Sequence, residues 1–126
     1  MSTEPARRFE HNRLAIDRTD SASAVVLRFA GKSVDRKPAD FITPILLDVL
    51  QDAGDSGRKI VLDFRDLAYM SSSTITPIIK VLERAKGGTN RLEVIYDPSL
   101  KWQSVNFTAL KIFETPDGRV RVRGAD

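Results

Sequence analysis

The sequence predicts an α/β fold with a mixed, mainly parallel sheet of about five strands and crossover helices mainly on one face. Segments in which every second residue is apolar alternate along the chain with segments of helical period. Strands separated by helices are typical of parallel neighbours joined by right-handed crossovers. Several expected strands carry charges on one face, whereas strands buried on both faces are continuously apolar. One face of the sheet should therefore stay partly accessible to water.

The composition is ordinary for a globular protein of one core. The chain has 126 residues, of which 41% are hydrophobic and 29% charged, and its net charge is +3. It has no cysteine, which excludes disulfides, thiolate catalysis and cysteine-ligated zinc and fits a cytoplasmic protein. No apolar run approaches the ~20 residues that span a membrane, and the N-terminus lacks a secretory pattern. We expect neither membrane nor nucleic-acid binding.

The chain should begin with a flexible tail, residues 1–11, followed by a single domain, residues 12–126. Two short strands come first, joined by a polar turn at Ser21, and together they suggest a hairpin. Their apolar residues are Leu14 and Ile16 in one strand, and Val25, Leu27 and Phe29 in the other.

The first helix should run from Pro38 to about Ala53, because proline fits the first turn of a helix. Pro44 lies inside this run and should kink the helix or move its start towards Thr43. Its expected core face consists of Phe41, Ile45, Leu46, Val49 and Leu50, with Ile42 and Leu47 at the margin.

The centre of the chain, Lys59–Gly88, should form a buried strand, a serine-rich turn and an amphipathic helix. The strand buries Ile60, Leu62 and Phe64, and the helix buries Ile75, Ile78, Ile79, Leu82 and Ala85. We expect Gly87-Gly88 to end the helix in a left-handed conformation.

A further strand, a helix and a last strand complete the expected fold. The strand covers Arg91–Asp97, the helix Leu100–Leu110 and the last strand Arg119–Arg123. The candidate core residues of that helix are Trp102, Val105, Phe107 and Leu110.

The residues give no coherent catalytic site, so we predict that the chain is not an enzyme and holds no cofactor or metal. A Ser-His-Asp arrangement needs a base, and the one histidine, His11, lies in the expected tail. Asp63 and Asp66 could bind a hard cation or transfer protons. Such residues are more often solvated charges at a strand end, and no third ligand is evident.

Four hydroxyls stand in a row at the junction of the central strand and helix: Ser71, Ser72, Ser73 and Thr74. They have two interpretations. Helix starts favour Ser and Thr as caps, and this explanation is the stronger one from the residues alone. Alternatively one hydroxyl is phosphorylated, since a helix N-terminus accommodates a phosphate.

The order of residues around this turn resembles the STAS domain of bacterial anti-sigma-factor antagonists. That family has Phe or Tyr, an apolar residue and then Asp-Ser-Ser-Gly-Leu, where this chain has Tyr69 to Ile75, with Ser71 for the aspartate and Thr74 for the glycine. The resemblance covers roughly Leu14 to Val122 and implies a STAS-like sheet with helices on one side. It implies a regulatory domain whose phosphoacceptor is Ser73, or Ser72 if the alignment slips by one residue.

The resemblance also implies partners. In the family, a kinase related to histidine-kinase ATPases doubles as the anti-sigma factor and phosphorylates the serine, and a PP2C-type phosphatase reverses the reaction. The residues expected to bind the partner are Asp66, Tyr69, Met70, Ser71, Ser72, Ser73 and Thr74. An alternative is a small-ligand-binding module of the same fold without a phosphoswitch, with Asp63, Asp66 and the serines as polar contacts.

Overall fold

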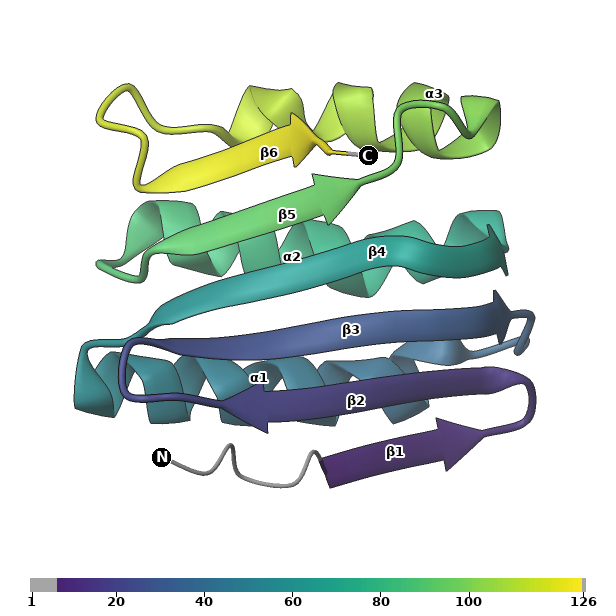
Figure 1. Ribbon diagram of the computed structural model, residues 1–126, viewed down its shortest axis with the longest axis horizontal. Helices are drawn as coiled ribbons and strands as arrows, with labels where there is room; N and C mark the ends of the chain where they lie inside the picture. The colour runs from purple at the N-terminus through teal and green to yellow at the C-terminus, as the bar shows by residue number, and fades with distance from the viewer. Residues whose placement is uncertain (1–6, 126) are drawn as a thin grey trace.

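The computed structural model describes residues 7–125, which form a six-stranded sheet and three α-helices (Figure 1). The strands lie in chain order across the sheet. They are β1 (Arg7–His11), β2 (Leu14–Asp20), β3 (Ala24–Ser33), β4 (Lys59–Met70), β5 (Leu92–Tyr96) and β6 (Val120–Gly124). The helices are α1 (Pro38–Ser56), α2 (Ile75–Gly87) and α3 (Lys101–Thr108), with short 3₁₀ turns η1 (Ser72–Thr74) and η2 (Ala109–Phe113).

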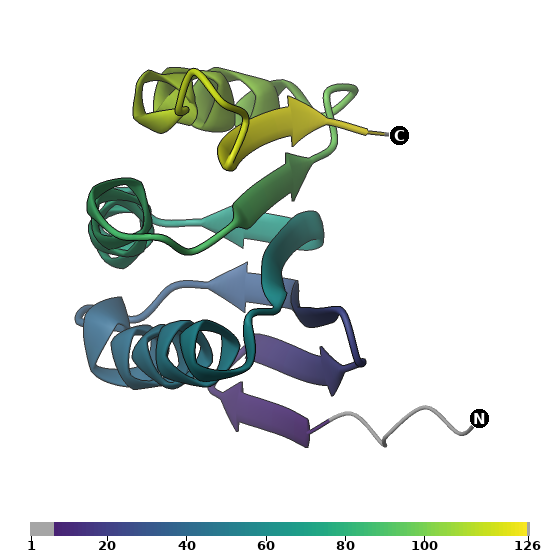
Figure 2. The ribbon, with the colours of Figure 1, turned by 90° about the vertical axis from the view of Figure 1, so that its left-hand side faces the viewer.

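The sheet is mixed and mainly parallel, and its helices cover one face, as predicted. β1, β2 and β3 pair antiparallel, while β3, β4, β5 and β6 pair parallel. α1, α2 and α3 are the crossovers between successive parallel strands. Figure 2 views the strands nearly end-on and shows the three helices on the same side of them. None of the helices in residues 7–125 is long and apolar enough to cross a membrane.

The strand β1 was not predicted, because its residues were expected to fray with the rest of the N-terminal tail. Arg7–His11 instead pair with β2, and Phe9 packs against the core opposite Ile16. Asn12 takes a left-handed backbone conformation, φ 54°, which makes the hairpin turn short. The remainder of the expected tail, residues 1–6, lies outside the described residues.

The core lies between the sheet and the helices and contains the apolar residues predicted for the strands. Its centre is a row of aromatic rings: the centroids of Phe29 and Phe64 are 4.4 Å apart, and those of Phe64 and Phe107 are 4.7 Å apart. The predicted residues that are buried here include Val25, Leu27, Ile45, Leu46, Val49, Ile60, Leu62, Ile78, Leu82, Leu92 and Val94. Such packing supplies most of the free energy that stabilises a domain of this size.

Helix α1 differs from its prediction in its start and its face. It begins at Pro38 and continues through Pro44, so the start does not move to Thr43. Ile42 is fully buried, whereas Phe41 and Leu50 are only partly buried. The buried face is therefore turned by about one residue from the predicted one.

Two further predictions about the helices were wrong. Gly88 follows α2 with φ −112°, not in the left-handed region; the left-handed cap is Gly57, after α1, with φ 67°. Val105 is 64% exposed, and the buried residues of α3 are Gln103 and Phe107. Gln103 and Phe107 are one helical turn apart, so this face excludes Val105.

The open face of the sheet carries charges that pair with one another. Glu93 was expected to be accessible, but it is only 7% exposed, with its carboxylate 2.9 Å from Lys59 Nζ and also bonded to Arg123. Asp63 is buried in the same way, 2.8 Å from Arg65. The face remains free of helices, and its arginines cover its acidic groups.

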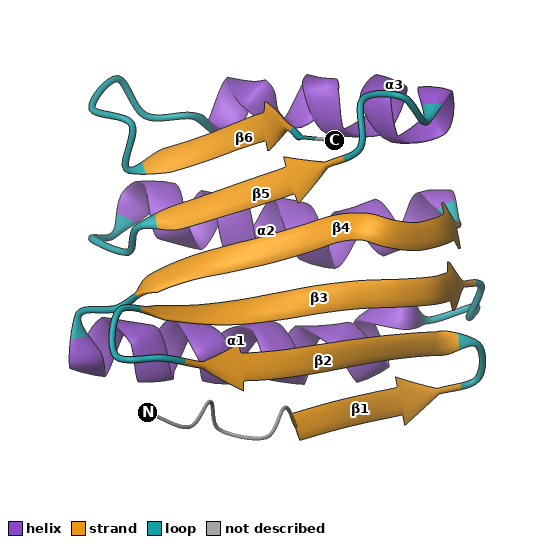
Figure 3. Ribbon diagram, viewed as in Figure 1, coloured by secondary structure: helices purple, strands orange, loops and turns teal. Residues whose placement is uncertain are grey.

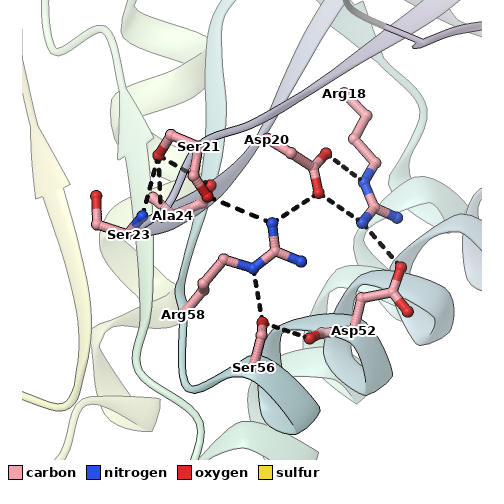
Figure 4. A network of polar contacts seen from close by, with 8 residues as sticks. All are labelled: Arg18, Asp20, Ser21, Ser23, Ala24, Asp52, Ser56 and Arg58. Carbon is pink, nitrogen blue, oxygen red and sulfur yellow. Dashed lines mark hydrogen bonds and ion pairs between the residues drawn. The ribbon is translucent and has the colours of Figure 1, made fainter. Parts of the chain in front are cut away.

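A second network holds the C-terminal end of α1 against the hairpin (Figure 4). Arg18 points to the helix side of the sheet, where its guanidinium lies 2.8 Å from Asp20 and 2.8 Å from Asp52 of α1. Arg58 donates to the same Asp20 carboxylate, also at 2.8 Å. The hydrogen bond from Arg18, aided by Arg58 and opposed by burial, lowers the pKa of Asp20 from 3.8 to about 2.

Candidate functional site

The hydroxyl-rich turn lies at the edge of the sheet where the parallel strands end. Figure 3 shows the loop after β3 and the turn after β4 next to each other at this edge. Ser33, the last residue of β3, pairs with Met70, the last of β4. The Ser71 N–H continues the ladder by donating to the Ser33 carbonyl oxygen at 2.9 Å. In open α/β sheets this edge is where binding sites usually form.

The turn itself, residues 71–74, leads directly into α2. Ser71 is extended, and Ser72–Thr74 form one 3₁₀ turn closed by the Thr74 N–H donating to the Ser71 carbonyl at 3.0 Å. No side-chain oxygen caps η1 or α2. The first interpretation of the cluster, that its hydroxyls cap a helix, therefore does not explain them.

Most of the hydroxyls bond to one another in a chain that runs from the interior to the surface. Ser33 Oγ lies 2.7 Å from Thr74 Oγ1, which lies 3.0 Å from Ser71 Oγ, and Ser71 Oγ lies 3.2 Å from Ser73 Oγ. Ser33 and Thr74 are buried, whereas Ser72 and Ser73 are exposed. The buried pair anchors the turn, and the exposed pair presents two adjacent hydroxyls to solvent.

The other residues predicted to bind a partner divide by exposure. Tyr69 is 50% exposed and Asp66 is exposed, both near the end of β4. Met70 is buried in the core, and Thr74 is buried in the hydroxyl chain. Of the predicted set, Met70 and Thr74 are thus buried, Ser71 is partly exposed, and Asp66, Tyr69, Ser72 and Ser73 are exposed.

Asp63 and Asp66 are not arranged as a cation site. Arg28 lies between them, 3.7 Å from the Asp63 carboxylate and 3.9 Å from that of Asp66. Burial raises the pKa of Asp63, but the hydrogen bonds and charge of Arg65 outweigh it, so the net shift is downward. Among residues 7–125, no three His, Asp or Glu side chains gather as metal ligands.

His11 belongs to β1 and contacts the loop before α1. Its Nε2 lies 2.9 Å from Asp35, and its ring lies 5.3 Å from that of Phe41. This imidazole already has a structural partner in the partly buried carboxylate of Asp35. His11 was expected to lie in a flexible tail and instead ends β1; that it takes no part in a catalytic triad stays a prediction.

Gln103 positions the end of β4, and the sequence reasoning missed it. Its side-chain amide donates to the carbonyl oxygens of Phe64 and Leu67 at 2.7 and 2.9 Å, and its Oε1 accepts from the Asp97 N–H at 2.8 Å. β4 is irregular at this point, since its register with β3 shifts twice. The signal in the sequence was a glutamine one turn before Phe107, on the core face of a helix.

Comparison with known proteins gives similarities of structure only. No protein-family model matches the chain, and no curated protein matches it either. SiaC of Pseudomonas aeruginosa matches with a TM-score of 0.63 and 16% identity over 99% of this chain and all of that one. A chain in the crystal structure of the P. aeruginosa diguanylate cyclase SiaD with its activator SiaC matches with a TM-score of 0.64 and 14% identity, covering 94% and 99% of the two chains.

A third similar structure is an uncharacterised protein of the DUF3478 family from Shewanella loihica PV-4, which is described as having a SpoIIAA-like fold. It is 18% identical, with a TM-score of 0.48 over 91% of this chain and 90% of that one. The two SiaC matches extend over nearly the whole length of both chains, which agrees with the sheet order and the one-sided helices described above. The chain therefore shares the fold of SiaC.

Proposed function

We propose that this chain is a regulatory protein-interaction domain that binds its partner through the turn at residues 71–74. The observation that carries the proposal is the pair of exposed hydroxyls, Ser72 and Ser73, on a turn fixed from below by buried Ser33 and Thr74. A rigid, accessible turn at the start of a helix suits recognition by another protein. No catalytic role is proposed.

Phosphorylation of Ser73, or of Ser72, would switch this binding. The first turn of α2 contains no acidic residue, so the helix N-terminus would not repel a phosphate. The added charge of about −1.5 to −2 would weaken a complex that desolvates the turn, because unpaired charge at an interface costs several kcal/mol.

We propose two classes of partner. The STAS resemblance favours a histidine-kinase-like ATPase that acts as an anti-sigma factor, with a PP2C-type phosphatase to reverse the modification. The likeness to SiaC, which activates a diguanylate cyclase, makes a nucleotide cyclase the second class. Tyr69 and Asp66, which are exposed beside the turn, would contribute to either interface.

A small-ligand-binding module is the second candidate, and the geometry supports it less. Asp63, which would have supplied a polar contact, is buried and bonded to Arg65. A ligand that raised the melting temperature without any protein partner would favour this candidate.

The test is a pull-down from native lysate with wild-type, Ser73→Ala and Ser73→Asp baits, with matching Ser72 variants as controls for position. We expect Ser73→Asp to fold normally and to lose the partner that wild type and Ser73→Ala retain. If only the Ser72 variants lose the partner, the phosphoacceptor is Ser72 and not Ser73. Equal recovery of every partner by all baits would refute the switch.

A further inference from the structure

A groove runs along the outer surface of the helix layer, between α1 and α2. Its larger half is a hollow of about 390 Å³, and the adjoining half is a hollow of about 310 Å³. Leu47 and Arg84 line both hollows, so the two adjoin along the helix pair. Buried Leu46 and Val81 form its floor, and Leu47, 38% exposed, stands at its side.

The two banks of this groove carry opposite charge. α1 contains four aspartates and no lysine or arginine, whereas α2 contains three basic residues and one glutamate. Asp55 lines the α1 side, and exposed Asp48 lies two turns before it, outside the lining. The α2 side is lined by Lys80, Arg84 and Glu83, so its net charge is positive. Asp48, Lys80 and Arg84 form no ion pair with any residue in the range 7–125. These charges are therefore available to a partner.

The shape of the groove fits a helix better than a strand or a second copy of this chain. Two neighbouring helices form a straight groove that a third helix can fill by ridges-into-grooves packing, and 13 residues of α2 give it a length of about 20 Å. An extended peptide needs unpaired backbone groups to bond with, which helix surfaces lack. On α1 and α2, Leu47 is the one large hydrophobic residue that is exposed. The apolar surface that one exposed leucine offers is smaller than the surface that a stable homodimer buries.

We propose that the groove binds an amphipathic helix of the protein partner, in a fixed direction set by charge. The apolar stripe of that helix would lie on Leu46, Leu47 and Val81, with acidic residues along Lys80 and Arg84 and basic residues along the α1 side. This inference rests on the proposed function, since it names the element of the partner that docks beside the turn. The groove begins near that turn, because Pro77 of the first turn of α2 lines it and η1 packs on α1.

The probe is a phage-displayed library of helical peptides about four turns long, randomised on all faces and selected on the wild-type protein. The selected peptides are then titrated by fluorescence anisotropy against wild type, Leu47→Asp and the double variant Lys80→Glu/Arg84→Glu. The matched control is Val105→Asp, which places the same charge at an exposed apolar residue of α3. Circular dichroism confirms that each variant is folded.

We expect a consensus with apolar residues at helical spacing, acidic residues on one flank and basic residues on the other. Leu47→Asp should weaken binding at least about tenfold and Val105→Asp should leave it unchanged. The double variant has two acidic banks, so it should prefer peptides with basic residues on both flanks. Selected peptides that bind Leu47→Asp as well as wild type, a consensus without helical spacing, or no enrichment would each overturn the proposal. So would a dimer of the protein itself that Leu47→Asp dissociates.

The outcome is separable from that of the proposed function. If Ser73→Asp releases a captured partner that Leu47→Asp retains, the groove proposal fails and the phosphoswitch stands. If selected helices occupy the groove while Ser73→Asp changes no partner, the switch fails and the groove stands.

Discussion

Replacing Gln103 by leucine should destabilise the protein strongly, although the two side chains have similar volume. Gln103 is fully buried, and its amide satisfies the carbonyl oxygens of Phe64 and Leu67 and the N–H of Asp97. Leucine fills the space but removes the hydrogen bond that Gln103 makes to each of these three buried backbone groups. Each buried unpaired group costs roughly 1–3 kcal/mol, so the expected loss is about 3–5 kcal/mol after partial relaxation.

The measurement is urea unfolding followed by far-ultraviolet circular dichroism, since Trp102 is too close to the change to serve as a neutral fluorescent probe. Gln51, the other glutamine, is exposed on α1 and is the matched control. Gln51→Leu should change the free energy of unfolding by no more than about 0.5 kcal/mol. A Gln103→Leu loss below about 1 kcal/mol would show that these hydrogen bonds do not hold the end of β4, and the site would lose its support.

Three further predictions concern the sheet and its charges. Leu62→Ala in the centre of the core should lower the free energy of unfolding by about 2–5 kcal/mol in urea; a loss under about 1 kcal/mol would contradict the assigned face. Glu93→Ala should lower the free energy of unfolding by about 1–2 kcal/mol, because it leaves the cations of Lys59 and Arg123 unpaired. The control is Arg121→Ala, its neighbour in register, which should lower it by about 0.5 kcal/mol or less. Equal losses in the two variants would refute the network. Asp20, whose pKa falls from 3.8 to about 2 on folding, contributes stability that is present above pH 4 and lost as the pH falls towards 2. The melting temperature of Asp20→Asn should therefore fall less over this range than that of wild type, and parallel curves would refute the contribution.

Local periodicity was sufficient to predict the order of elements and most of the core. Apolar residues alternate in the first part of β3 and of β4 and in most of β5, so the inward faces of these segments followed from the spacing alone. β1 could not be found in this way, because Phe9 is its one large apolar residue and its pairing depends on the turn at Asn12. In α3, apolar residues occur on several faces, and packing on the sheet selected the face with Gln103.

The position of the hydroxyl-rich turn was predictable from the sequence, and the arrangement of its side chains was not. Four consecutive hydroxyls between a strand and a helix located the turn. Which of them are buried depends on Ser33, which is 41 residues before Thr74 and meets it only through the register of β3 on β4. The pairing of β3 with β4 shifts its register twice, and the pattern of residues within either strand does not reveal these shifts. The burial of Glu93 has a similar cause, since Lys59 and Arg123 reach it from neighbouring strands.

The central claim is that charge at Ser73 controls partner binding, and the most direct test is the affinity of protein carrying phosphoserine at residue 73. Phosphoserine can be installed there by genetic code expansion and compared with unmodified protein by titration against the captured partner. Phosphoserine at Ser23, an exposed residue in the β2–β3 turn at the opposite edge of the sheet, is the control for added charge. The account predicts at least about tenfold weaker binding with phosphoserine at 73 and unchanged binding with phosphoserine at 23. Equal affinity of the unmodified protein and the protein phosphorylated at residue 73 would contradict it.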